Sequence, residues 1–282
     1  MSDNAIAKNE AIRFSKDERT GIASFSFGSG TRDFVILPGL SPTMLCDLAE
    51  LIAKRYEALA DDFRITLFDR PEFPPSAYGI KDMASDLASA MKSAGISNAT
   101  VLGSSQGGMI AQQLAVDYPD AVHALVLCAT TCKSYKQTQD IIGTWLAIAE
   151  KGDKAALGRQ LANDIYSPAV AKSLAGEGLS RMISEISDEL LKRFVTLGKS
   201  CLTFDLSESV SKIKCRTLVI GSKGDKITLP EGAETLAQLI PQSELLMYGS
   251  EYGHGIVDEI PNLPEKIKEF ALFKDTSKSL RV

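Results

Sequence analysis

The chain has 282 residues, of which 44% are hydrophobic and 24% are charged, and its formal net charge is -5. This slightly acidic balance gives no reason to expect binding to nucleic acid or to an anionic membrane. No apolar run reaches the roughly 18 residues that are needed to span a bilayer, and the length fits a single α/β domain with an insertion.

The N-terminal stretch and the cysteines indicate the compartment. Residues 1–19 are polar and charged, and they lack the apolar segment of a secretory signal peptide. The five cysteines are scattered without Cys-x-x-Cys spacing, so we expect reduced thiols in a cytoplasmic protein. Two histidines far apart in the sequence make a metal site improbable. We expect no cofactor and a small-molecule substrate as partner, with a homodimer left open.

Strand-like and helix-like patterns alternate along the chain. Short apolar runs typical of strands are followed by apolar residues at three- and four-residue steps, which are typical of helices. This alternation predicts an α/β fold with a mostly parallel twisted sheet flanked by helices. The first strands are expected in succession at one edge of the sheet, where antiparallel pairing is plausible. The expected strands cover residues 12–14, 22–27, 63–68, 98–102, 122–127, 218–220 and 245–248, with one more that contains Phe34, and the expected helices cover 45–59, 80–94, 109–118, 231–240 and 262–272.

The pattern changes between Cys132 and Lys214, where strand-like runs vanish and short helical patterns take over. We expect residues 132–213 to form a helical cap inserted into a core domain made of residues 1–131 and 214–282. The alternative is a set of extra packing helices with no role at the site. The clearest expected helices cover residues 144–150, 155–165, 170–174 and 188–197.

The most informative stretch is Gly103-Ser104-Ser105-Gln106-Gly107-Gly108, which joins an expected strand to an expected helix. The spacing Gly-x-Ser-x-Gly puts a serine on a tight strained turn, where small neighbours let the backbone pass close to adjacent elements. An ordinary Gly/Ser loop is the alternative. In the first interpretation, Ser105 is a nucleophile.

A nucleophilic serine needs a general base. His254 lies in a glycine-flanked loop after an expected strand, which suits a catalytic base. His123 lies at the beginning of an apolar strand and fits a surface position better. His254 is therefore the candidate base.

The base in turn needs an acid that fixes its tautomer. Asp225 follows an apolar strand in a glycine-containing turn, whereas Asp205 precedes that strand and Asp258 is expected on a solvated surface. Asp225 is therefore the candidate acid. The resulting chain order of serine, acid and histidine is the one found in α/β-hydrolases.

These segments together resemble the α/β-hydrolase superfamily over about residues 34–270, and in particular a capped esterase-like or lactonase-like member. Residues 33–42 resemble the strand and oxyanion loop of the family, with Pro38 in place of the usual histidine. Residues 63–71 resemble the strand and Asp-Arg-Pro turn that precede the elbow, with Glu72 where the family usually has glycine. The resemblance implies that the backbone N–H groups of Leu40 and Gln106 form an oxyanion hole.

The resemblance implies a serine hydrolase that cleaves a small carboxylic ester, thioester or lactone through an acyl-enzyme on Ser105. One alternative is a carbon-carbon bond hydrolase or a perhydrolase with the same triad, and another is a ligand-binding member of the fold without turnover. The apolar residues Met44, Met109 and Trp145 are expected to line the substrate pocket together with Leu40.

Arginine positions bear on the choice between these alternatives, because a carbon-carbon hydrolase of dicarboxylate-like substrates would need a cation at the site. In the sequence no arginine lies next to the elbow or beside the oxyanion loop. Arg159, Arg181 and Arg193 lie in the expected cap and could reach the site.

Overall fold

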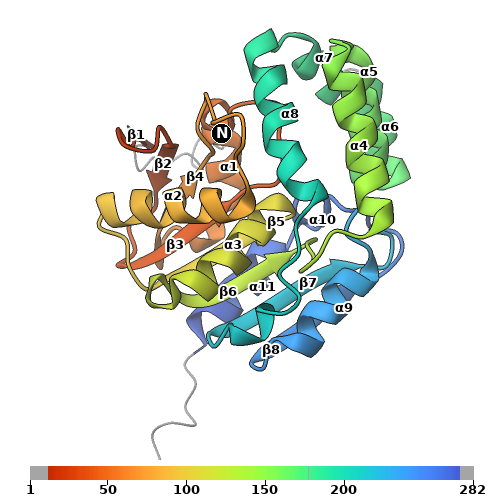
Figure 1. The fold of residues 1–282 in the computed structure, drawn as a ribbon. Helices are drawn as coiled ribbons and strands as arrows, with labels where there is room; N and C mark the ends of the chain where they lie inside the picture. The colour runs from red at the N-terminus through yellow and green to blue at the C-terminus, as the bar shows by residue number, and fades with distance from the viewer. Residues whose placement is uncertain (1–11, 177, 274–282) are drawn as a thin grey trace, which may run out of the picture.

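Eight strands form one sheet in the order β1-β2-β4-β3-β5-β6-β7-β8 in the computed structural model, which describes residues 12–176 and 178–273 (Figure 1). The first part of the N-terminal stretch discussed above, residues 1–11, therefore lies outside the described residues. β1, β2 and β4 pair antiparallel and the other neighbours pair parallel. The predicted mostly parallel α/β sheet is confirmed. The strands are β1 (Arg13–Lys16), β2 (Ala23–Phe27), β3 (Arg32–Leu37), β4 (Phe63–Phe68), β5 (Ala99–Ser104), β6 (Val122–Cys128), β7 (Arg216–Ser222) and β8 (Ser243–Tyr248).

The central strands bury almost all of their residues, whereas the edge strand β1 is exposed along its whole length. Parallel strands read as near-continuous apolar runs because helices cover both faces of the sheet. β1 and β2 lie at one edge, as the sequence suggests, but β4 separates β2 from the next strand in the chain. β3 is therefore not a neighbour of β2, and the expected succession of strands at this edge covers only β1 and β2.

Helices cover the two faces and build two separate cores. α2, α3 and α9 pack over one face, and α1 and α11 pack over the other, in agreement with the two clusters of buried side chains. The expected helix over residues 45–59 is interrupted, with short 3₁₀ turns before and after its α-helical part. The helices are α1 (Ala49–Arg55), α2 (Ile80–Ser93), α3 (Gln106–Asp117), α9 (Pro230–Leu239), α10 (Ile256–Glu259) and α11 (Leu263–Leu272).

Five more helices, α4–α8, lie between β6 and β7 in the chain and stand together above the sheet in Figure 1. The sequence did not predict α7, which lies beside a glycine-containing stretch. It packs on α5, where a Cβ added to Gly158 would lie 2.6 Å from the Cα of Ser180, so Gly158 permits a close contact between the two helices. The helices are α4 (Lys136–Glu150), α5 (Lys154–Ile165), α6 (Pro168–Gly176), α7 (Leu179–Ser184) and α8 (Asp188–Leu202).

Within residues 12–176 and 178–273, no helix combines the length and apolarity needed to cross a membrane. The same residues contain no group of three or more His, Cys, Asp or Glu side chains arranged to hold a metal ion.

Candidate active site

Ser105 occupies the turn between β5 and α3 with a backbone φ of 52° and ψ of -120°. A positive φ is unfavourable for a residue with a Cβ and persists only where the surroundings hold it. Those surroundings are tight: the Ser105 N–H donates to the carbonyl of Cys128, and the Thr130 hydroxyl donates to the Ser105 carbonyl at 2.8 Å. A Cβ on Gly107 would lie 2.0 Å from the Leu37 carbonyl oxygen, so only glycine permits this approach of α3 to β3.

The candidate base and acid come from the loops after β8 and β7. His254 Nε2 lies 2.9 Å from Ser105 Oγ, and His254 Nδ1 lies 2.9 Å from Asp225 Oδ2. His254 and Asp225 are buried and Ser105 is partly buried. The three side chains thus form one hydrogen-bonded chain at the carboxyl ends of parallel strands, where α/β sheets place their sites.

The Asp225 carboxylate is held by its own turn as well as by His254. Oδ1 accepts the backbone N–H groups of Ile227 at 2.8 Å and Thr228 at 3.0 Å, and Oδ2 accepts the Thr228 hydroxyl at 2.6 Å. Burial acts to raise the pKa of Asp225, but the charge of His254 and the hydrogen bonds outweigh burial, and the pKa is lowered. Asp225 is therefore a carboxylate at neutral pH and can accept a hydrogen bond from the Nδ1–H of His254.

The other candidates considered in the sequence lie elsewhere. His123 is exposed at the beginning of β6, near the amino-terminal end of this parallel strand, whereas Ser105 lies at the carboxyl end of the neighbouring β5. Asp205 is exposed and accepts hydrogen bonds from the N–H and hydroxyl of Ser207. Asp258 is exposed and accepts the Tyr166 hydroxyl at 3.1 Å.

The loop after β3 lies against the nucleophile. A Cβ on Gly39 would lie 3.3 Å from the Ser105 Cβ, so the residues just before Leu40 pass directly beside the serine. Gln106 is the first residue of α3, and the first N–H groups of a helix have no partner within it. Both positions are therefore available for the oxyanion role that the resemblance implies, and that role stays a prediction.

Arg70, from the turn after β4, anchors this loop. Arg70 Nη1 donates to the Pro38 carbonyl at 2.9 Å, and Nη2 donates to the Gly39 carbonyl. Arg70 therefore lies beside the oxyanion loop in space, although no arginine lies beside this loop in the sequence. Arg70 is only 4% exposed and bonded to the loop, so it is not available to a substrate carboxylate. The Asp-Arg-Pro turn was visible in the sequence, but the reach of its side chain back to Pro38 was not.

The guanidinium of Arg193 in α8 is also bonded to other groups of the protein. Its Nη2 lies 2.8 Å from Asp69 Oδ1, and both side chains are buried. Further N–H groups donate to the carbonyls of Arg70 and Pro71 at 2.9 Å. Arg159 and Arg181 are exposed. Among the expected cap arginines, the one closest to the oxyanion loop therefore has its guanidinium engaged by the core.

The predicted pocket residues do not share one environment. Met109 and Trp145 are buried, and the Trp145 indole N–H donates to Asp164 Oδ2 at 2.7 Å, between α4 and α5. Met44 and Leu40 are partly buried in the oxyanion loop. Their role as pocket walls stays a prediction.

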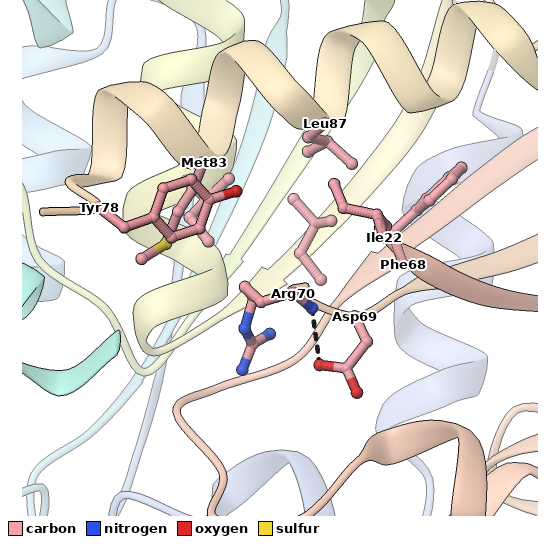
Figure 2. Close-up of a pocket in the computed structure, with 9 residues that line it drawn as sticks. Ile22, Phe68, Asp69, Arg70, Tyr78, Met83 and Leu87 are labelled. Atoms are coloured by element: carbon pink, nitrogen blue, oxygen red, sulfur yellow. Dashed lines mark hydrogen bonds between the residues drawn. The ribbon is translucent and has the colours of Figure 1, made fainter. Parts of the chain in front are cut away.

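A small cavity lies beside the Asp-Arg-Pro turn, under α2 (Figure 2). Its volume of about 10 Å³ corresponds to roughly one water molecule, far below the several hundred Å³ of a ligand pocket. It is therefore not a substrate site, and none of the predicted pocket residues lines it. The lining residues are Ile22, Leu37, Phe68, Asp69, Arg70, Tyr78, Met83, Leu87 and Ile110.

The sequence pattern of the α/β hydrolase fold family matches residues 34–259, and the chain belongs to this family. It is 27% identical over 177 residues to a provisionally named carbamate hydrolase, RutD, of Klebsiella pneumoniae, and the match covers 61% of this chain and 65% of that protein. A pyrrolizixenacetamide deacetylase of Xenorhabdus hominickii is 28% identical over 173 residues, which cover 57% of this chain and 61% of the deacetylase. In both cases the chain spans less than two thirds of the relative's length.

Solved structures agree with the fold. The enol-lactonase of Burkholderia xenovorans superposes with a TM-score of 0.78 at 19% identity, over 92% of this chain and 99% of the lactonase. At this identity the likeness shows the fold alone. The resemblance inferred from the sequence motifs is thus confirmed for family and fold, and the family supports hydrolase activity.

Proposed function

We propose that this chain is a serine hydrolase that cleaves a small carboxylic ester, thioester or lactone through an acyl-enzyme on Ser105. The observation that carries the proposal is the hydrogen-bonded chain from Ser105 through His254 to Asp225, built on a strained turn between strand and helix. A serine is held in this conformation at a cost, which points to a functional reason for the strain.

The geometry supports the following mechanism. Asp225 accepts a hydrogen bond from the Nδ1–H of His254, and this tautomer leaves the Nε2 lone pair facing the Ser105 hydroxyl. His254 takes the serine proton as Oγ attacks the acyl carbon, and then donates that proton to the leaving group. Water, activated by the same imidazole, hydrolyses the acyl-enzyme. The N–H groups of Leu40 and Gln106 stabilise the oxyanion that forms in each half of the reaction.

Residues 132–213 act in this proposal as a cap over the core made of residues 1–131 and 214–282. Contacts on the histidine loop support it, because the Gly255 N–H donates to the Ile165 carbonyl at 2.7 Å and the Ser167 N–H donates to the Glu259 carboxylate at 2.7 Å. Side chains of the cap and of the oxyanion loop then form the walls of the acyl pocket, with Met44, Met109 and Trp145 as candidates.

The alternatives have less support. A carbon-carbon hydrolase of dicarboxylate-like substrates would need a free cation, and the two arginines nearest the oxyanion loop are buried and bonded to the protein. A strained serine hydrogen-bonded to a buried His-Asp pair argues against a binding protein without turnover, and turnover of substrate distinguishes the two functions. The names of two sequence relatives, a carbamate hydrolase and a deacetylase, support acyl transfer to water.

A fluorophosphonate probe tests the proposal directly. We expect it to label Ser105 and no other residue, and Ser105→Ala to lower kcat on nitrophenyl esters on the order of 10³-fold or more. Ser104→Ala is the matched control, because Ser104 is the last residue of β5 and precedes the strained position. Labelling that persists in Ser105→Ala, or that moves to Ser104, would disprove the assignment.

A further inference from the structure

The peptide between Gly39 and Leu40 is oriented by a buried cation. Arg70 donates to the carbonyl oxygens of Pro38 and Gly39, which belong to two consecutive peptide units of the oxyanion loop. The described backbone contains no cis peptide bonds. In a trans peptide the C=O and the N–H point in opposite directions. Because the Gly39 carbonyl faces Arg70, the N–H of Leu40 must face away from Arg70.

Arg70 carries its charge into this position. Burial lowers the pKa of Arg70 to about 10, so the guanidinium is still cationic at neutral pH. A cation that binds a peptide carbonyl polarises that peptide and strengthens the N–H at its other end as a donor. The contact with Arg70 therefore affects both the direction and the strength of the Leu40 N–H.

The farther part of the same loop is held from α8. Arg193 donates to Asp69 Oδ1 at 2.8 Å, and Asp69 Oδ2 accepts the Leu45 N–H at 2.6 Å. Arg193 also binds the carbonyl of Arg70 itself at 2.9 Å. Figure 2 shows Asp69 and Arg70 extending in different directions from neighbouring positions at the end of β4, so the pair can hold two ends of the loop. Residues 38–45 are thus clamped at both ends by one buried cluster.

The second oxyanion donor is tied to the same helix. The buried Gln106 side chain donates from Nε2 to the Leu197 carbonyl at 2.8 Å and lies 3.2 Å from Ser200 Oγ. Leu197 and Ser200 both belong to α8. The backbone N–H of Gln106 therefore has its position set partly by a helix that lies 91 residues farther along the chain.

We propose that Arg70 is a positioning residue for the oxyanion hole, and that Arg193 of α8 holds Arg70 in place. The helical insertion and the oxyanion hole are therefore structurally coupled. This inference rests on the proposed hydrolase function. Arg70 acts through the Gly39–Leu40 peptide and replaces the anchoring that a histidine at position 38 would supply. Pro38 contributes only its carbonyl.

The test compares Arg70→Met, Arg70→Lys and Arg193→Lys with the wild-type chain. Turnover of nitrophenyl butyrate gives kcat and KM, and a short alkyl trifluoromethyl ketone measures oxyanion binding, because its adduct with serine carries the negative oxygen. We expect Arg70→Met to lower kcat by about 10- to 100-fold, with KM changed less than about threefold, since a lost oxyanion donor costs on the order of 10² in kcat. Affinity for the ketone should fall in parallel with kcat/KM. Arg193→Lys should shift the same two quantities in the same direction.

Arg216→Met is the matched control. Arg216 also donates to backbone carbonyls, those of Phe270 and Phe273. It is the first residue of β7, so it lies at the amino-terminal end of this parallel strand, away from the carboxyl ends that carry the candidate site. We expect this variant to lose thermal stability with kcat unchanged. Arg70→Lys keeps a buried positive charge beside Asp69, and it replaces Arg70→Met in the kinetic test if Arg70→Met does not fold.

The outcomes are distinct. Folded Arg70 variants with kcat within about threefold of wild type would overturn the inference, as would a rise in KM alone or an equal loss of kcat in Arg216→Met. A wild-type chain that is neither labelled by fluorophosphonate nor active on any ester would overturn the proposed function itself, and this inference with it.

Discussion

At the scale of single residues, Thr228 supports the acid of the candidate triad. Its hydroxyl donates to Asp225 Oδ2 at 2.6 Å and its backbone N–H donates to Oδ1 at 3.0 Å. These bonds, with the charge of His254, lower the pKa of Asp225 in spite of burial. A carboxyl group with a lowered pKa in the folded state stabilises the fold above its unfolded pKa of about 3.9, and this contribution is lost as the pH falls through the folded pKa.

Thr228→Val tests this account, since it removes the hydroxyl and keeps the shape. We expect the free energy of unfolding at pH 7 to fall by about 1 to 3 kcal/mol, the range for a hydrogen bond to a charged group. The difference from wild type should shrink in acid, below about pH 4, as the carboxylate becomes protonated. Urea unfolding between pH 3 and 7, by about one-unit steps, measures it.

Thr144→Val is the control, because Thr144 is exposed and its hydroxyl bonds to the Asp140 carbonyl within α4. Its effect should be small and independent of pH. A Thr228→Val effect that was equally large at pH 3 and at pH 7 would contradict the electrostatic explanation.

Asp225→Asn probes the orientation of His254. The backbone N–H groups of Ile227 and Thr228 hold the amide oxygen of Asn at the Oδ1 position, so the amide NH2 faces His254 Nδ1 and donates to it. The imidazole then carries its proton on Nε2 and cannot accept the serine proton. We expect kcat to fall on the order of 10³-fold or more, with KM affected much less. Steady-state kinetics on nitrophenyl butyrate measures this, and Asp258→Asn is the control because Asp258 bonds to Tyr166 instead. An active Asp225→Asn would remove Asp225 from the triad.

At the scale of elements, two glycines in helices differ in how closely the rest of the chain approaches them. In α3, a Cβ on Gly107 would collide with the backbone of residues 37 and 38 at 2.0 to 2.6 Å. In α4, a Cβ on Gly143 would meet nothing within 4 Å. Gly107 therefore sets the distance between α3 and β3, and Gly143 sets no distance at all.

We predict opposite effects for the two alanine variants. Gly107→Ala should destabilise the protein by at least about 1 to 3 kcal/mol through overpacking, and it should abolish activity because the elbow must shift. Gly143→Ala should stabilise it by about 0.5 to 1 kcal/mol, since glycine in a helix interior costs about that much relative to alanine. Chemical denaturation and ester turnover measure both, and equal effects in the two variants would refute the argument from close approach.

The elements themselves were largely predictable from the sequence. All eight strands were expected, because buried parallel strands are short continuous apolar runs bounded by turn residues. α7 and α10 were not expected, since a helix of one or two turns has no clear period and is stabilised by tertiary contacts. The neighbours of β2 were also unpredictable, because the order of strands depends on long-range pairing.

The residues of the candidate site also fall into a group that the sequence predicts and a group that it does not. Ser105, His254 and Asp225 each sit at a glycine-containing turn after a strand, so local pattern and chain order identified them. Arg70 and Arg193 act through side chains that reach elements 32 and 124 residues away. No local pattern marks such a reach, and only the folded chain shows that these arginines are buried and bonded to other parts of the protein.

At the scale of the whole molecule, the helical insertion is attached to the core on both sides of Ser105. Arg193 of α8 binds Asp69 on the side of the oxyanion loop, and the segment after α5 binds the histidine loop through the Ile165 carbonyl and the Ser167 N–H. In our proposal this insertion acts as a cap, and its attachment at two places limits the room above the nucleophile and therefore the length of the acyl group.

Substrate length and charge should therefore both matter. We expect nitrophenyl esters of about two to six acyl carbons to be turned over faster than longer ones, with each added methylene contributing about 0.8 kcal/mol, or roughly fourfold in kcat/KM, until the cap is reached. A terminal carboxylate on the acyl chain should lower kcat/KM, because Arg70 and Arg193 are buried and already bonded. The series from acetate to laurate, with monoesters of dicarboxylic acids as the charged partners of equal length, measures both effects. A kcat/KM that kept rising to laurate would indicate an open, lipase-like site, and a preference for the charged esters would mean that a cation outside these two arginines faces the substrate.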